Sequence, residues 1–88
     1  MEIKKAAAAG TMESSDVYVE IEPGKGIQIQ LESVVLAQYA DAIEKAVREV
    51  LLEQGVENAC IRVTDRGALD CVIRARVETA IHRGKGDA

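Results

Sequence analysis

The sequence predicts an α+β fold in which two helices pack on one face of a three-stranded, mostly antiparallel sheet. Apolar and polar residues alternate in three short segments, which is the period of a half-buried strand. Two longer segments have apolar residues at helical spacing. The segments follow the order strand, strand, helix, strand, helix, which is typical of a two-layer domain. With 88 residues, the chain is expected to form a single domain over residues 1–88.

The three strands are expected at residues 17–22, 27–32 and 59–64, where Val, Ile, Leu and Ala occupy every second position. Between the first two strands, Pro23–Gly26 supplies a fixed φ and two glycines that tolerate positive φ, so a hairpin is predicted. The connection through the first helix makes the third strand run parallel to the second. We therefore place the third strand beside the first, in the spatial order 2-1-3, which makes every neighbouring pair antiparallel.

The first helix is expected to follow Ser33, a residue type favoured at the N-cap, and to end at Gly55, where a left-handed residue is typical. Its apolar face is predicted to hold Val35, Tyr39, Ala42, Ile43, Ala46, Val47, Val50 and Leu51.

The second helix is expected to start near Ala68, with a charge ladder of Asp70, Arg74 and Glu78 spaced four residues apart. Residues 1–15 are predicted to form a flexible lead and residues 84–88 a frayed tail. The apolar stripe of this helix is expected to comprise Leu69, Val72, Ile73, Val77, Ala80 and Ile81.

Composition limits the possible functions. The net charge of −4 would repel phosphate backbones, so nucleic-acid binding is not expected. No apolar run approaches the ~20 residues that span a bilayer, so no membrane insertion is expected. Two cysteines outside a CxxC pair and a single histidine are too few for a zinc site. Without an evident leader at its start, the protein is expected to be reduced and cytoplasmic.

The segment most suited to carrying chemistry reads Ala-Gly-Thr-Met-Glu-Ser-Ser-Asp, over residues 9–16. A serine that bears a phosphodiester-linked group needs an exposed hydroxyl and accessible backbone, and this segment precedes the first predicted strand. The carboxylates of Glu13 and Asp16 would keep it solvated but would not activate a hydroxyl, so a separate enzyme would have to attach the group. From spacing alone, Ser14 and Ser15 are both candidates, and an ordinary lead into a strand is the alternative.

Other reactive side chains have simpler interpretations. Cys71 lies beside a predicted helix start, where the helix dipole would favour a thiolate, but packing is the preferred role for it and for Cys60. His82 is expected to be solvated near a helix end. Arg74 and Arg76 could meet phosphates or partner carboxylates, although a solvated helix face with ladder pairs is the default interpretation.

Together with Asp65–Cys71 and Arg74–Glu78, the segment Ala9–Asp16 resembles the acyl carrier protein of citrate lyase, the gamma subunit of that complex. Met12 stands where the family has leucine. In that family the first serine after the glutamate bears phosphoribosyl-dephospho-coenzyme A. The resemblance therefore implies that Ser14 holds this group through a phosphodiester and that the group carries acetyl and citryl thioesters during cleavage of citrate to acetate and oxaloacetate.

The resemblance also implies three partners: the alpha subunit, an acyl transferase; the beta subunit, a citryl lyase; and the enzyme that transfers the prosthetic group. The chain itself would have no catalytic residue and bind no metal. Two alternatives remain open at this point, namely the acyl carrier subunit of malonate decarboxylase and an unmodified adaptor domain that docks through the open face of its sheet.

Overall fold

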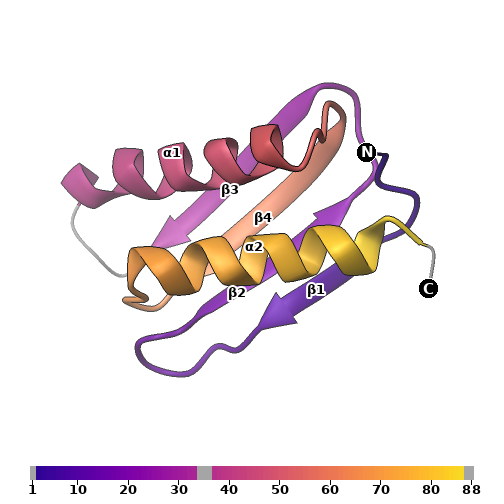
Figure 1. Cartoon of the computed structure of the whole chain (residues 1–88). Helices are drawn as coiled ribbons and strands as arrows, with labels where there is room; N and C mark the ends of the chain where they lie inside the picture. Colours follow the sequence, from indigo (N-terminus) through magenta and orange to yellow (C-terminus); the bar gives the residue numbers. More distant parts are fainter. Residues whose placement is uncertain (1, 34–36, 87–88) are drawn as a thin grey trace.

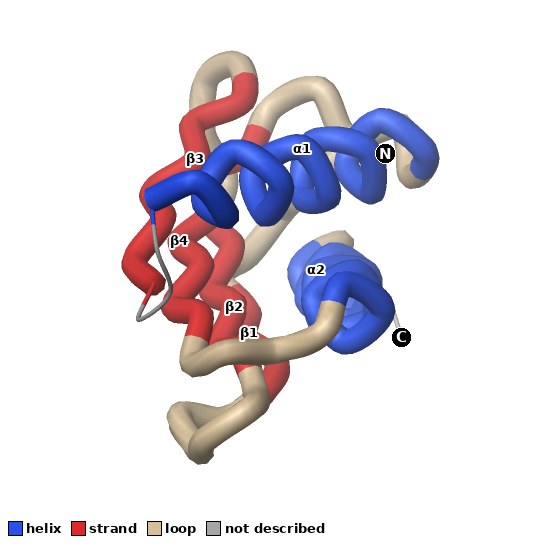
Figure 2. The backbone as a smooth tube through the Cα atoms, turned by 90° about the vertical axis from the view of Figure 1, so that its left-hand side faces the viewer, coloured by secondary structure: helices blue, strands red, loops and turns tan. Residues whose placement is uncertain are grey.

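The computed structural model describes residues 2–33 and 37–86 and has two layers, with both helices on one face of a four-stranded sheet (Figures 1 and 2). The predicted α+β class and the placement of the helices are confirmed, but the predicted count of three strands is wrong. The elements in chain order are β1 (Ala7–Gly10), β2 (Val17–Glu22), β3 (Ile27–Ser33), α1 (Ala37–Glu53), β4 (Ala59–Asp65) and α2 (Asp70–Gly84).

The sheet is mixed and has the order β1-β2-β4-β3. Because β2 and β3 are not neighbours, the predicted hairpin between them is wrong. The predicted order 2-1-3, which is β3-β2-β4 in the labels of the structure, is wrong as well. β4 lies between β2 and β3, antiparallel to β2 as predicted and parallel to β3. The four-residue loop from Pro23 to Gly26 must therefore pass across the start of β4, a span of about two interstrand spacings of ~4.8 Å. A Cβ at Gly24 would lie 3.1 Å from the Cys60 nitrogen, so glycine permits this close crossing.

The unpredicted strand is β1, which lies inside the segment expected to be a flexible lead. Its run of small residues does not alternate with polar ones and therefore carries no strand signal. It pairs antiparallel with β2 and ends at Gly10, whose φ is +99°. A Cβ at Gly10 would lie only 1.9 Å from the Val17 carbonyl oxygen, so this position requires glycine.

The described part of helix α1 begins at Ala37. Ser33 is the last residue of β3, and its hydroxyl donates to Asp65 Oδ2 (3.0 Å). The amides that its predicted N-cap role would engage belong to residues 34–36, which lie outside the described residues. The predicted end is confirmed, because Gly55 has φ +70° and its N–H donates to the Leu52 carbonyl. Of the predicted apolar face, the last five members are buried, Tyr39 and Ala42 are exposed and Val35 lies outside the described residues.

Helix α2 begins at Asp70, with Leu69 exposed at the position just before it. The rest of the predicted stripe is buried or half-buried against the sheet. Gly84, predicted to begin a frayed tail, is the buried last residue of the helix, and its carbonyl accepts hydrogen bonds from the Lys4 and Lys5 amides. Residues 87–88 lie outside the described residues.

The core between sheet and helices is aliphatic, as a chain with neither Phe nor Trp requires. Alternate residues of β2 and β4 face the helices and are at most 1% exposed. These strands form the centre of the sheet, and the β1–β2 and β4–α2 connections lie at the same end of it. The side chains that fill the centre are Val17, Val19, Ile21, Ala59, Ile61 and Val63.

Candidate functional site

The segment that joins β1 to β2, residues 11–16, forms a tight turn at one end of the sheet (Figure 1). The Asp16 N–H donates to the Glu13 carbonyl (3.2 Å), which makes Ser14 and Ser15 the central residues of the turn. Ser15 has a φ of +65°, a left-handed conformation that side chains rarely adopt. Ser14 is exposed, and within the described residues nothing hydrogen-bonds to its hydroxyl.

The carboxylate of Asp16 holds both ends of this turn. Its Oδ2 accepts a hydrogen bond from Thr11 Oγ1 (2.6 Å), and its Oδ1 accepts one from the Val17 amide (2.7 Å). Thr11 Oγ1 in turn accepts a bond from the Glu13 amide (3.2 Å). One side chain therefore connects the residue that begins the turn with the residue that follows it.

A second set of contacts ties the turn to the connection between β4 and α2. The Ser15 amide donates to the Arg66 carbonyl, and the Arg66 amide donates to the Asp16 carbonyl, both at 2.9 Å. Arg76, on α2, approaches the Asp16 carboxylate with two nitrogens, Nε at 3.3 Å and Nη2 at 3.0 Å. Ser14 thus projects from a turn whose backbone is held on several sides.

These contacts lower the pKa of Asp16 below its ordinary value. The largest cause is the hydrogen bond from Thr11, followed by the bond from the Val17 amide, while the Arg76 guanidinium adds to the effect. Asp16 is therefore a carboxylate already engaged by donors. It is not a candidate base for the Ser14 hydroxyl.

The role of Arg76 was not predictable from its position in the sequence, because its partner Asp16 is 60 residues away. The prediction for Arg74 is confirmed in part: its Nε donates to Asp70 Oδ2 at 2.7 Å, but the residue is half-buried and its second partner is Glu49 on α1. Those two bonds, that to Glu49 first, raise the pKa of Arg74. Because Arg74 and Arg76 are two residues apart on a helix, their side chains point in different directions. This spacing is the signal in the sequence that could have indicated different partners for the two arginines.

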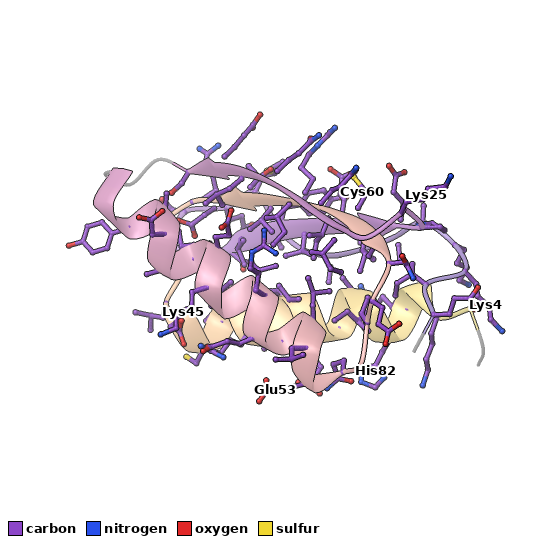
Figure 3. All side chains as sticks on the ribbon, turned by 90° about the horizontal axis from the view of Figure 1, so that it is seen from above. Lys4, Lys25, Lys45, Glu53, Cys60 and His82 are labelled. Atoms are coloured by element: carbon purple, nitrogen blue, oxygen red, sulfur yellow. The ribbon has the colours of Figure 1, made fainter. Side chains whose placement is uncertain are left out.

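The other predicted candidates lie apart from the turn. Cys60 is half-buried on the sheet face that the helices leave open (Figure 3). Cys71 is exposed, so the packing role preferred for it is wrong. His82 is exposed as expected, with Nε2 3.9 Å from Glu78 Oε1. Both thiols are free.

Among residues 2–33 and 37–86, no group of three His, Cys, Asp or Glu side chains could hold a metal ion. In the same part of the chain, neither helix is long and apolar enough to cross a membrane.

Exposed apolar side chains gather at the end of the molecule that bears the turn. Met12 belongs to the turn, Tyr39 to the start of α1 and Leu69 to the start of α2, and each is more than half exposed. Between the two helix starts lies an open hollow of about 280 Å³, which Tyr39, Ile43, Gly67 and Ala68 help to line. Arg66, which bonds to the turn, immediately precedes Gly67, so the hollow and the Ser14 turn are neighbours.

A small two-layer domain that presents an exposed serine on a held turn has the features of a carrier domain. The profile of the family described as malonate decarboxylase delta subunit (MdcD), an acyl carrier protein family, matches residues 4–84. Among solved structures, a chain of a Pseudomonas malonate decarboxylase hetero-tetramer in complex with malonate has the same fold, with a TM-score of 0.71 and 24% identity. That match covers 94% of this chain and 91% of the other.

The most informative similarities are to curated relatives. The citrate lyase acyl carrier protein of Escherichia fergusonii is 53% identical over 85 residues, which is 94% of this chain and 88% of that protein. That of Lactobacillus helveticus is 52% identical over 84 residues, covering 94% and 87%. The chain belongs to the family of citrate lyase acyl carrier proteins, the gamma subunits, and is a non-catalytic carrier within a multi-subunit complex.

Proposed function

We propose that Ser14 bears phosphoribosyl-dephospho-coenzyme A through a phosphodiester and that the chain carries acetyl and citryl groups between the active sites of citrate lyase. The observation that carries this proposal is the exposed Ser14 hydroxyl, without a hydrogen-bond partner among the described residues, at the tip of a turn. Ser15 is less suited because its amide is bonded to Arg66 and its backbone is left-handed.

The surroundings of Ser14 fit an anionic group better than the sequence suggests. Two carboxylates flank the serine pair, and free carboxylates would repel a phosphodiester. The Asp16 carboxylate, however, is paired with the Arg76 guanidinium and accepts two further hydrogen bonds. Glu13 is exposed to water, where screening is strong. The net local charge is therefore less negative than the segment Glu-Ser-Ser-Asp implies.

Attachment requires Ser14 Oγ to act as the nucleophile. Its oxygen forms a bond to phosphorus of an activated donor, the bond from that phosphorus to a diphosphate leaving group breaks, and the hydroxyl proton passes to a base. No side chain among residues 2–33 and 39–86 hydrogen-bonds to the hydroxyl, so we assign the base to the prosthetic-group transferase.

Once bound, the group supplies a thiol that holds acyl cargo as a thioester. This chain contributes attachment, reach and docking, because a tethered group visits neighbouring sites at an effective concentration on the order of mM. The proposed partners are the alpha subunit, an acyl transferase, and the beta subunit, a citryl lyase. We place the protein in the cytoplasm, with which its free Cys60 and Cys71 thiols are consistent.

Every partner that acts at Ser14 must approach the end of the molecule that bears it. Met12, Tyr39 and Leu69 give this end its exposed apolar contacts, and Asp70 adds a carboxylate beside the hollow. A partner surface with an apolar centre and a basic rim would complement both features. We therefore propose this surface, called the serine end below, as the docking face for the lyase subunits.

The attachment site is tested with Ser14→Ala and Ser15→Ala proteins, each incubated with the transferase and its coenzyme-derived donor. We expect intact mass spectrometry to show the adduct on Ser15→Ala but not on Ser14→Ala, and peptide fragmentation to place it at Ser14. Only the Ser15→Ala protein should then restore citrate cleavage to alpha and beta subunits. An adduct on Ser14→Ala would refute the assignment.

A second candidate is the carrier subunit of malonate decarboxylase, which the description of the matching family profile favours. The two are separated by supplying the modified protein to each set of partner subunits. We expect citrate cleavage to be restored and malonate decarboxylation not to be. The reverse pattern would replace the proposed substrate while leaving the carrier role intact.

A further inference from the structure

Side-chain contacts connect the Ser14 turn to the rest of the domain. Membership of the family does not assign a role to these contacts. Asp16 accepts bonds from the beginning of the turn, from the residue after it and from helix α2. The bond from α2 is bidentate, since Arg76 Nε and Nη2 approach different carboxylate oxygens at 3.3 and 3.0 Å. Such a two-point contact fixes direction as well as distance.

The turn needs such support because part of it is strained. Ser15 has a φ of +65°, which is unfavourable for a residue with a side chain and persists only where the surroundings impose it. Its amide donates to Arg66, and the amide of Arg66 donates to the carbonyl of Asp16. If Asp16 were released, the constraint on both sides of Ser15 would weaken, and the direction in which the preceding Ser14 points would no longer be fixed.

We propose that Arg76 is a positioning residue for modification of Ser14: through Asp16 it holds the turn in the conformation that the prosthetic-group transferase recognises. Arg76 also supplies a positive charge to the carboxylate two residues from the hydroxyl that receives the anionic group. The inference rests on the proposed attachment at Ser14. According to this inference, the modification of Ser14 depends on the side chain of Arg76, which is 60 residues away from its partner Asp16 in the sequence.

The chain offers a matched control in Arg74. It lies two residues before Arg76 on the same helix, its side chain is 36% exposed against 39% for Arg76, and it pairs with two carboxylates. Those carboxylates, of Asp70 and Glu49, belong to the two helices and not to the turn. If Arg76 contributed only to stability, replacing either arginine by glutamine would affect modification to a similar degree.

The experiment measures kcat and KM for modification of wild-type, Arg76→Gln and Arg74→Gln proteins with the transferase and its coenzyme-derived donor, by intact mass. We expect Arg76→Gln to lower kcat/KM about tenfold to a hundredfold, as a misplaced reacting group does, mainly through kcat. Arg74→Gln should stay near wild type. Arg76→Lys, which keeps the charge but not the two-point contact, should recover only part of the rate.

Two further variants guard against a trivial loss of folding. Thr11→Val removes a donor to Asp16 with little change in shape and should also slow modification, while circular dichroism shows a folded protein. Adding Asp16→Asn to Arg76→Gln should cost little more than either change alone, because both act through one contact. If Arg76→Gln is modified at the wild-type rate, or if Arg74→Gln is equally slow, the positioning role is wrong. If wild-type protein is not modified at Ser14, the proposed function fails and this inference fails with it.

Discussion

Turns and helix ends form both ends of this domain, but the two ends differ in the side chains that they expose. At the serine end, the β1–β2 turn, the β4–α2 connection and the starts of both helices meet, with Met12, Tyr39 and Leu69 exposed. At the opposite end the loop from Pro23 to Gly26 crosses β4, α1 ends at Glu53 just before Gly55, and residues 2–3 lie beside that loop (Figure 1).

The difference lies in how each end is held. At the opposite end, glycines shape the connections. Gly26 and Gly55 adopt left-handed conformations, and the Asn58 side chain accepts a hydrogen bond from the Gly26 amide (2.8 Å). At the serine end, Gly10 and Gly67 also have positive φ, but there Ser15, a residue with a side chain, is left-handed as well, and side chains from separate elements hold its turn. A turn whose conformation is fixed by such contacts, and which presents the exposed Ser14 hydroxyl, suits a site that partner enzymes must recognise.

The largest effect that distinguishes the ends should come from adding one methyl group to a glycine at each. Gly10→Ala places Cβ 1.9 Å from the Val17 carbonyl oxygen at a φ of +99°, whereas the Cβ of Gly26→Ala meets nothing within 4 Å. We expect Gly10→Ala to lower the free energy of unfolding by roughly 3 kcal/mol. Gly26→Ala should lower it by about 1 kcal/mol through its backbone alone.

Urea unfolding followed by circular dichroism measures both values. Similar losses for the two variants would mean that the chain relaxes around Gly10, and that the β1–β2 connection is less constrained than its contacts indicate.

A smaller effect should distinguish the two ends in their contribution to citrate cleavage. Leu69, at the serine end, is 71% exposed, and Leu52, near the end of α1, is 80% exposed, so glutamate at either position should leave stability almost unchanged. With carriers that already bear the prosthetic group, we expect Leu69→Glu to reduce citrate cleavage by alpha and beta subunits about tenfold, the loss of one good interface contact. Leu52→Glu should retain the wild-type rate.

Using modified carriers separates docking from attachment in this assay. Equal losses for the two leucine variants would place the docking surface on both ends or on a third face, such as the open face of the sheet.

The sequence predicted those parts of the fold that depend on local periodicity. Strands β2, β3 and β4, both helices and the end of α1 just before Gly55 follow from residue spacing and turn chemistry. The order of the strands did not follow, because Pro23–Gly26 is equally compatible with a hairpin and with a loop that crosses a strand. β1 was missed because alanines carry no alternation.

For the site, the exposed serine could be proposed from the sequence, but the structure that holds it could not. The carboxylate of Asp16 looks like a solvating charge in the segment, and Arg76 looks like a solvated helix residue; only the fold brings them together. Asp65, which directly follows the predicted third strand, gives a second example: it is 1% exposed and accepts bonds from the Ser33 hydroxyl and the Ala68 amide. Contacts between residues far apart in sequence leave no periodic signal.

The smallest expected effect is the pH dependence that Asp16 gives the serine end. Because its pKa is lower in the folded protein than its ordinary value of 3.8, its contribution to stability is fully present above pH 3.8 and is lost as the pH falls through the folded pKa. We expect the Tm difference between wild type and Asp16→Asn to be constant from pH 7 to about 5 and to shrink below about pH 4. Asp70→Asn is the matched control, since the Asp70 side chain is 65% exposed against 16% for Asp16 and among the described residues bonds only to Arg74. If Asp70→Asn changed the acid limb of the Tm profile as much as Asp16→Asn, exposed charge in general, and not the contacts at the turn, would account for the pH dependence.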